Sequence, residues 1–268
     1  MNYSETKPHG LSARFVKLYW QLSYGKNEMS VGPEPVLPDG CVEIIFDFRD
    51  RFVTYLAAGA TEVQPRSIIA GQLTSRLMIG PGGDTDIFGV RLRSESAFSL
   101  LGISMVEIRD QVVDLRDVLG AVEGELFEKL AAVEGLAERI EIFEKYLLTL
   151  NTRPVSTELS ECVSILRTTN GSKAISHCAT DLRWSERRLE RNFNEQIGLS
   201  PKLFARILRF QSLLAMADKD NLSLLDQAFA AGYYDQSHMI RDFRNFAGVT
   251  PMEYFGRDLM LSRLFLDS

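Results

Sequence analysis

The sequence has few cysteines, few histidines and no long hydrophobic run. Its 268 residues include three cysteines and three histidines. Cys41, Cys162 and Cys178 are odd in number, lie far apart and form no C-x-x-C pair, which argues against a disulfide scaffold or a zinc site and is typical of a reducing compartment. No stretch of about 18 or more apolar residues is present, and the first ten residues lack the apolar core of a signal peptide. We therefore expect a cytoplasmic protein with no membrane association, no metal and no cofactor.

An excess of positive charge is also absent. The net charge is −6, and residues 158–258 contain 13 lysines and arginines against 13 aspartates and glutamates. Nucleic-acid-binding domains are usually basic, so this balance argues against such a function for the chain as a whole. Binding to a nucleic acid would have to depend on a few locally placed charges.

Residues 11–93 have the composition of short strands separated by turns. β-Branched and aromatic residues gather in five segments, 13–20, 41–48, 52–56, 67–70 and 87–92, and clusters of glycine and proline lie between them. This pattern predicts a small β-barrel or β-sandwich. The glycines of 80–83 lack the G-K-[ST] of a phosphate-binding loop, and we interpret them as a hairpin turn.

The pattern becomes helical from residue 94 onward. In the segment 136–150, apolar residues recur at steps of three and four, which predicts an amphipathic helix. Its apolar stripe would either pack on its own domain or form a homodimer seam. Residues 151–157 break the periodicity with a proline and polar residues, which is typical of a linker. We predict an α+β protein with an N-terminal domain over 1–150, a linker over 151–157, an all-helical domain over 158–258 and a short tail over 259–268.

The helical half contains an internal repeat. At an offset of 50 residues, the paired positions are Leu189 and Met239, Arg191 and Arg241, Phe193 and Phe243, Gly198 and Gly248, and Ser200-Pro201 and Thr250-Pro251. In the segment that precedes the turn of each unit, the offset is 49, which pairs Ile175 with Leu224 and Ala179 with Ala228. One residue is therefore inserted in the turn of the second unit, where insertions are tolerated.

Each repeat predicts a short helix, a turn and a second helix. Ser185 and Asp235 are suited to cap the second helices, because their side chains accept hydrogen bonds from first-turn amides. Leu189 with Phe193, and Met239 with Phe243, face one side of their helix. The outer side then presents Arg187, Arg188, Glu190, Arg191 and Asn194 in the first unit, and Gln236, Ser237, Ile240 and Arg241 in the second. Arginine and glutamine suit guanine and adenine edges, and isoleucine suits the thymine methyl group.

Residues 201–217 predict the helix that joins the two units. Proline stands at its first position and strong helix formers follow. Seventeen residues at about 1.5 Å each give a rod of about 25 Å. Such a rod would hold two second helices close to one DNA turn apart, so that they enter successive major grooves.

The chain resembles the AraC/XylS family of transcription regulators over residues 158–257. The resemblance rests on ATDLRWSERRLERNF in 179–193, AFAAGYYDQSHMIRDF in 228–243 and GVTP in 248–251. In that family the helices that begin near Ser185 and Asp235 read DNA. The resemblance implies that Arg187, Arg188, Glu190 and Arg191, and Gln236, Ser237, His238, Ile240 and Arg241, contact double-stranded DNA, with RNA polymerase as a further partner. Glu186 and Glu190 are acidic, so the first DNA-reading helix is not purely basic.

Three of these residues could have a structural role instead of contacting a base. Arg191 and Arg241 each precede a buried phenylalanine by two positions and could instead pair with a carboxylate inside the fold. His238 lies near a helix start, where it would cap the helix or contact phosphate rather than bind a metal.

The first domain resembles the small β-rich sensor domain of one branch of the same family. The matching segments are PDGCVEIIFD in 38–47, AGQLT in 70–74 and FGVRLR in 88–93. A barrel could hold a small-molecule effector between its sheets. The expected pocket residues are Tyr19, Trp20, Glu43, Arg76 and Arg91. Alternatively, Trp20 is a core residue, and Glu43 and Arg91 face solvent or each other.

Two further functions are weighed against DNA binding. A barrel enzyme is disfavoured because His9 is the only histidine before residue 177 and no Ser/His/Asp set is visible. A helical protein-interaction module that does not bind DNA is compatible with the neutral charge of 158–258. Our main prediction is a regulator that binds DNA in a sequence-specific manner and is not an enzyme.

Overall fold

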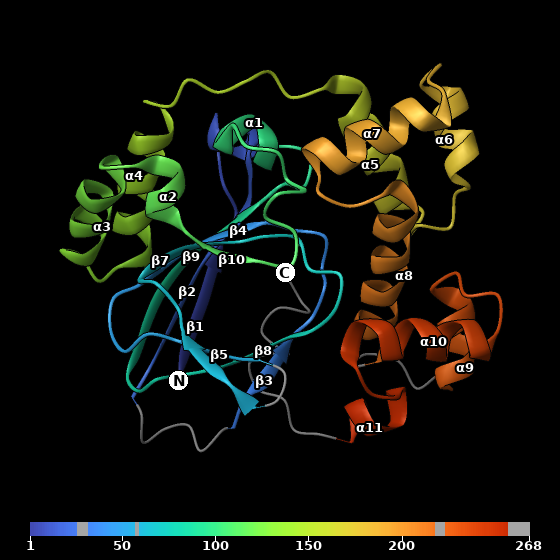
Figure 1. Ribbon diagram of the computed structural model, residues 1–268, viewed down its shortest axis with the longest axis horizontal. Coiled ribbons are helices and arrows are strands. Elements are labelled where there is room, and N and C mark those ends of the chain that lie inside the picture. The colour runs from blue at the N-terminus through green and yellow to red at the C-terminus, as the bar shows by residue number, and fades with distance from the viewer. Residues whose placement is uncertain (26–31, 57–58, 218–222, 257–268) are drawn as a thin grey trace.

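The computed structural model describes residues 1–25, 32–56, 59–217 and 223–256. The tail predicted at 259–268 lies outside these described residues. An N-terminal part built of strands and helices lies beside an all-helical C-terminal part (Figure 1). The predicted α+β class is therefore confirmed.

Two antiparallel sheets form the N-terminal part. The larger sheet has the strand order β1-β2-β9-β4-β7-β10 and the smaller has the order β3-β8-β5-β6. The strands are β1 (Asn2–Thr6), β2 (Val16–Tyr24), β3 (Glu34–Val36), β4 (Glu43–Asp47), β5 (Val53–Tyr55), β6 (Thr61–Val63), β7 (Ser67–Ala70), β8 (Leu77–Gly80), β9 (Thr85–Leu92) and β10 (Val112–Asp114). All five segments that the sequence predicts as strands contain one.

The glycine-rich segment 80–84 is not the hairpin turn that its composition suggests. β8 pairs with β3 and β5 in the smaller sheet, whereas β9 pairs with β2 and β4 in the larger one. The segment therefore carries the chain from one sheet to the other. Composition reveals a turn but does not indicate which strands the turn connects, so the hairpin interpretation was wrong.

The larger sheet buries side chains on both of its faces. Successive side chains of a strand point to opposite faces, and along β2 Leu18, Trp20 and Leu22 share a cluster with Phe52 and Ile87. Tyr19 belongs to the opposite cluster, which includes Phe46, Phe88 and Phe143. The first face turns toward the smaller sheet and the second toward the helices.

Four helices, α1 to α4, come after β9 in the chain, with β10 between α1 and α2, and cover the second face of the larger sheet (Figure 1). They are α1 (Ala97–Leu101), α2 (Leu115–Leu119), α3 (Val122–Ala131) and α4 (Leu136–Leu147). Phe143 and Leu147 of α4 are buried in this cluster, and Leu136, Ile140 and Leu150 pack against it. The apolar stripe of 136–150 thus packs on its own domain, and this face of α4 is not open to a second chain. A homodimer through 136–150 would need other side chains.

The segment 151–157, predicted as a linker, packs on helix α1. The backbone amide of Arg153 donates to the carbonyl of Ser99 at 3.0 Å, and its guanidinium lies 5.0 Å from the ring centre of Phe98. Helix α5 (Thr157–Thr168) begins at the last residue of the predicted linker, and its cap Ser156 also lies within that segment.

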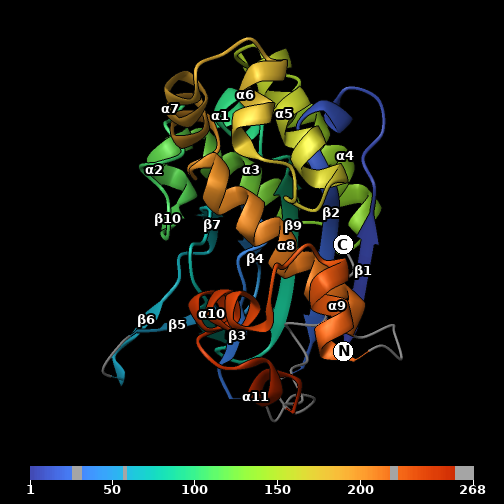
Figure 2. The ribbon, with the colours of Figure 1, turned by 90° about the vertical axis from the view of Figure 1, so that its right-hand side faces the viewer.

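The C-terminal part consists of helices around one apolar core. The helices are α5 (Thr157–Thr168), α6 (Ile175–Asp181), α7 (Glu186–Gln196), α8 (Pro201–Ala217), α9 (Leu224–Ala230), α10 (Gln236–Ala247) and α11 (Pro251–Phe255). Figure 2 faces this part and shows α8 between the pair α6/α7 above and the pair α9/α10 below. Leu37 of the N-terminal part also enters this core. Within the described ranges, no helix combines the length and apolar character that crossing a bilayer requires.

Candidate functional site

Helices α6 and α7 form the first repeat unit. The side chain of Ser185 accepts a hydrogen bond from the backbone amide of Arg188 at 3.2 Å, which confirms the predicted cap. Leu189 and Phe193 are fully buried. Because these residues anchor one face of α7, the opposite face points away from the core, as the periodicity predicts.

The predicted reading side chains of α7 differ in how freely they can move. Arg187, Arg188, Glu190 and Arg191 are all exposed. The guanidinium of Arg188 lies 4.3 Å from the ring centre of Trp184, a cation–π contact that holds it near the start of the helix. Asn194 is half-buried, and its amide donates to the carbonyl of Glu190 at 3.0 Å. Asn194 is therefore the least available of the five.

Helices α9 and α10 form the second unit. The carboxylate of Asp235 accepts a hydrogen bond from the amide of His238 at 2.7 Å, as predicted for a cap. Met239 and Phe243 are buried. Residues 182–185 separate α6 from α7, and residues 231–235 separate α9 from α10. The additional residue of the second unit thus lies in its turn, where the shift of the repeat from 49 to 50 places it.

The predicted reading side chains of α10 fall into two groups. Gln236, Ser237 and Arg241 are exposed. His238 is half-buried, with its ring 5.2 Å from that of Tyr233, and Ile240 packs against the core. The last two are therefore less available for contact. Arg191 and Arg241 are exposed at equivalent positions, which disfavours the alternative that they form ion pairs inside the fold.

Helix α8 holds the two units together from the inside. The ring of Phe204 meets that of Phe193 of α7 edge to face, with 5.9 Å between ring centres, and the ring of Phe210 lies 5.2 Å from those of Phe243 and Phe246 of α10. These aromatic contacts fix both recognition helices to one continuous rod.

A cavity of about 120 Å³ lies between the two sheets of the N-terminal part. Of the five residues predicted for an effector pocket, Trp20, Glu43 and Arg91 line it, whereas Tyr19 and Arg76 do not. Tyr19 is next to Trp20 on β2 and therefore points to the other face, where its hydroxyl donates to Glu144 at 3.2 Å. Arg76 instead reaches the C-terminal part and donates to the carbonyl of Ala247 at 3.0 Å.

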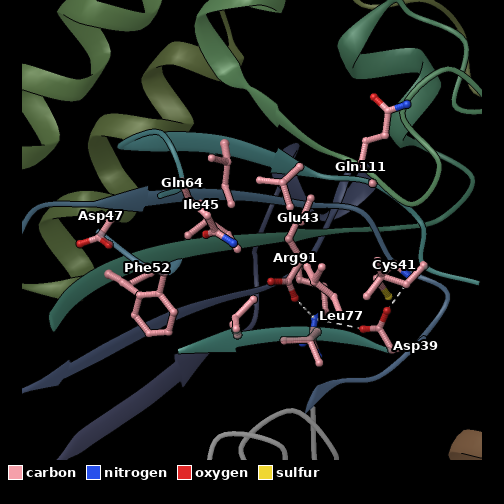
Figure 3. A pocket seen from close by; sticks show the side chains of 18 of the residues that line it. Asp39, Cys41, Glu43, Ile45, Asp47, Phe52, Gln64, Leu77, Arg91 and Gln111 are labelled. Atoms are coloured by element: carbon pink, nitrogen blue, oxygen red, sulfur yellow. Dashed lines mark hydrogen bonds and ion pairs between the residues drawn. The ribbon is translucent and has the colours of Figure 1, made fainter. Parts of the chain in front are cut away.

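Charged side chains gather at one end of the cavity. Arg91 is 2% exposed, and its Nε lies 2.5 Å from Glu43 and 3.6 Å from Asp39 (Figure 3). Burial raises the pKa of Glu43, and Arg91 opposes that rise. Burial alone would lower the pKa of Arg91, but the two carboxylates together raise it. One guanidinium thus faces two carboxylates, so the positive charge of Arg91 is already compensated and would not attract an anionic ligand.

A third carboxylate lines the cavity near Phe52, away from Arg91 (Figure 3). Asp47 is 5% exposed, and its Oδ2 has no hydrogen-bond partner among the described residues. Burial raises the pKa of Asp47 to about 6, against the lowering effect of the Arg49 and Phe52 amides. A buried carboxylate oxygen without a partner carries a desolvation cost that a donor group would relieve.

Sequence reasoning missed Asp39, Asp47 and Gln211 as cavity residues. A period of two along β4 would have found Asp47, because Glu43, Ile45 and Asp47 share one face of that strand. Gln211 belongs to α8, and its amide donates to the carbonyl of Pro38 at 2.7 Å. No local pattern relates these two positions, which are far apart in the sequence.

Two family models match separate regions of the chain. Residues 178–257 match a family described as a helix-turn-helix domain, and residues 4–114 match a domain of unknown function (DUF6597). An uncharacterised HTH-type transcriptional regulator of Haemophilus influenzae is 27% identical over 108 residues, which are 40% of this chain and 35% of that protein. The match thus spans about a third of the length of that curated relative.

Solved structures of ToxT from Vibrio cholerae are similar to the chain at low sequence identity. An apo ToxT variant has a TM-score of 0.49 at 14% identity, covering 90% of this chain and 98% of that one. Wild-type ToxT bound to an unsaturated fatty acid has a TM-score of 0.44 at 13% identity, covering 94% of this chain and 93% of that one. With the two family matches, the repeat and its capped recognition helices identify the C-terminal region as an AraC-type helix-turn-helix domain, which follows an N-terminal DUF6597 domain.

Proposed function

We propose that the chain is a sequence-specific DNA-binding transcriptional regulator that places α7 and α10 in two successive major grooves. The observation that carries the proposal is the pair of capped helices at equivalent positions of the repeat, each with exposed arginine or glutamine near its start. A binding site of roughly 16 to 20 base pairs follows from two insertions one turn apart. We retain the division into 1–150 and 158–258 as part of this proposal.

Local charge favours DNA binding despite the balanced totals. Arg187, Arg188 and Arg191 are exposed on one helix of the first unit, and Arg241 and Arg244 on one helix of the second. The amino-terminal ends of both helices add the partial positive charge of the helix dipole. Acidic residues dilute this charge, so we expect weak nonspecific binding and a clear preference for one sequence.

Selection of bound duplexes from a random pool, followed by titration of the selected duplex at several salt concentrations, tests this function. We expect a selected motif with two conserved segments and an affinity that falls with salt, with a logarithmic slope of about −0.9 per contacted phosphate. A helical interaction module is the other function that the neutral charge would permit. It would select no motif and would not bind duplexes even in dilute buffer, and that result would refute our proposal.

We further propose that the cavity between the sheets takes a small effector. Its volume of about 120 Å³ is comparable to an engineered cavity of roughly 150 Å³ that binds benzene. The walls are largely apolar, with Trp20, Phe52 and Ile87 among them. The paired state of Arg91 and the free oxygen of Asp47 favour an effector with an apolar body and an amine or other donor, over one with a carboxylate.

Two other partnerships stay predictions. The contact with RNA polymerase rests on the resemblance to the AraC/XylS family. A homodimer through 136–150 has lost its main support, because the apolar stripe of α4 is buried in its own domain.

A further inference from the structure

The two recognition helices end against the N-terminal part at the same position of the repeat. Gly198 and Gly248 are equivalent, and both adopt left-handed backbone, with φ of +88° and +70°. A Cβ on Gly198 would lie 2.8 Å from the carbonyl oxygen of Met105, and one on Gly248 would lie 2.5 Å from the guanidinium carbon of Arg76. Glycine thus permits both the turn and the close approach. The N-terminal part therefore contacts the two repeat units at equivalent positions.

Hydrogen bonds accompany both contacts. Nη1 of Arg76 donates to the carbonyl of Ala247 at 3.0 Å, and Nη1 of Arg109 lies 3.5 Å from the carbonyl of Gly198. The amide of Met105, which is fully buried, donates to the carbonyl of Glu195 at 2.8 Å. The last carbonyls of a helix, here those of Glu195 and Ala247, lack partners within the helix and carry partial negative charge, so donors are favoured there.

The two arginines belong to two loops that are tied together. Thr74 donates to the carboxylate of Asp110 through its amide at 2.6 Å and through its hydroxyl at 2.7 Å. The amide of Asp110 in turn donates to the carbonyl of Gln72 at 2.8 Å. We call the loops 71–76 and 104–111, with Arg76 and Arg109, the arginine clamp. Because its halves are linked, the clamp joins the end of α7 to the end of α10 by a route independent of α8.

The base of the clamp forms part of the cavity wall. Gly71 and Leu73 from one loop line the cavity, as do Gln111 and Val112 at the end of the other. The reading side chains Arg187 and Gln236 lie at the opposite ends of their helices and remain exposed. The clamp therefore leaves the proposed DNA-reading surface uncovered.

We propose that Arg76 and Arg109 are positioning residues that fix the placement of α7 relative to α10. The inference rests on the proposed function, since placement of the two helices matters only if both read one duplex. Loss of the clamp leaves the connection through α8 and the shared apolar core, so the helices vary more in their separation. The regulator then tolerates a wider range of spacings between the two segments of its DNA site.

A distance measurement without DNA tests the clamp itself. Glu186 and Gln236 are equivalent and exposed, so nitroxide labels on cysteines at these two positions would report the separation of the helices. The native cysteines are buried and burial raises their pKa, so they stay unlabelled in the folded full-length chain. We expect a narrow distance distribution in the otherwise unchanged protein and a broader one after Arg76→Gln with Arg109→Gln. Asp110→Gly removes the carboxylate that accepts both bonds from Thr74 and suits the positive φ of 57° at that position, so it should broaden the distribution as well without touching either helix.

The matched control is Arg116→Gln, an exposed arginine on α2 that should leave the distribution narrow. An unchanged width in both the double variant and Asp110→Gly would refute the clamp whether or not the protein binds DNA. Binding to duplexes whose two segments are moved apart or together by one base pair then tests the consequence. We expect the double variant to lose the preference for one spacing. Tighter binding of the double variant at every spacing would overturn the inference, because the clamp would then be inhibitory.

Discussion

Arg206 of α8 and Asp242 of α10 form an ion pair in which Nη2 and Oδ1 are 2.7 Å apart. The side chain of Asp242 is 1% exposed and that of Arg206 is 26% exposed. Nε of Arg206 reaches the same oxygen at 3.0 Å. The guanidinium also lies 5.2 Å from the ring centre of Phe246. The second recognition helix is thus attached to the connecting rod by a charge pair as well as by aromatic packing.

Replacement of Arg206 by Met should destabilise the protein strongly. The substitution keeps most of the apolar stem but leaves the carboxylate of Asp242 buried without its cation, which costs about 2–4 kcal/mol of unfolding free energy. Equilibrium urea unfolding followed by circular dichroism measures this loss. Arg244→Met on α10, the helix that carries Asp242, removes an exposed arginine and should change the free energy of unfolding by less than about 0.5 kcal/mol. Equal effects of the two substitutions would show that the ion pair contributes little.

The sequence predicts the C-terminal half better than the N-terminal half, and the reason is the range of the interactions. Ser185 and Asp235 cap helices through amides three residues away, so a local pattern finds them. The pairing of Leu189 with Met239 and of Gly198 with Gly248 follows from the repeat. The caps depend on residues that are close in the sequence, and the paired positions follow from comparing the two repeats. Both kinds of information are present in a single sequence.

The cavity and the clamp depend on contacts that no local pattern contains. The prediction that Tyr19 lines the pocket together with Trp20 is wrong, because adjacent residues of a strand do not line the same face. The prediction for Arg76 rests on its charge alone and is also wrong, since its partner Ala247 is 171 residues away in the sequence. The sequence does not reveal Asp242 as a buried residue, because an aspartate that follows an exposed arginine such as Arg241 in a helix is usually exposed too. Each error concerns tertiary packing rather than the identity of an element.

Removal of a reading side chain should weaken DNA binding without weakening the fold. Arg187→Ala or Gln236→Ala removes an exposed group at the start of a recognition helix and should cost about 1–3 kcal/mol on the selected duplex if the residue reads a base. Fluorescence anisotropy at fixed salt measures the change, and urea unfolding checks that stability is retained. Arg116→Ala, far from both units in the sequence, serves as the control. Unchanged affinity would remove the substituted residue from the reading surface.

The ionisation of Asp47 should make stability depend on pH. The pKa of Asp47 is about 6 in the folded protein, through burial and, less strongly, the nearby Asp86 and Asp50, whereas an unfolded aspartate titrates near 3.9. Between these values the folded state holds the proton more tightly. Stability is therefore lost as the pH rises from about 4 to about 6, by about 1–3 kcal/mol.

Asp47→Asn should remove this dependence and stabilise the protein at neutral pH. Urea unfolding of both proteins at pH 4.5 and 7.5 measures the difference, and Glu62→Gln on the exposed strand β6 is the control for a change of net charge. A lower free energy of unfolding for Asp47→Asn than for the unchanged protein at pH 7.5 would contradict the prediction.

The cavity should distinguish an amine from a carboxylate of the same shape. Trp20 lines the cavity, and the second of the two tryptophans, Trp184, lies in the first helix-turn-helix unit. In a Trp184→Phe background, the fluorescence of Trp20 therefore reports cavity occupancy. The test compares the affinities of 2-phenylethylamine, 2-phenylethanol and phenylacetate, which share a ring and differ in charge. Asp47 should favour the amine through a charge-assisted hydrogen bond, the alcohol should bind less tightly, and the carboxylate should bind least because Asp39, Glu43 and Asp47 repel it.

Asp47→Asn separates the effect of charge from the effect of shape. The variant keeps the size of the side chain, so the alcohol should bind as before while the advantage of the amine disappears. Lowering the pH to 5 protonates Asp47 in the unchanged protein and should weaken amine binding in the same direction, because the pKa of Asp47 is about 6. Preferential binding of phenylacetate would contradict the assignment and would mean that Arg91 is freed from Glu43 and Asp39 when the cavity fills. Because a compound held in the cavity also stabilises the fold by mass action, a shift in the unfolding midpoint gives a second readout that does not depend on tryptophan.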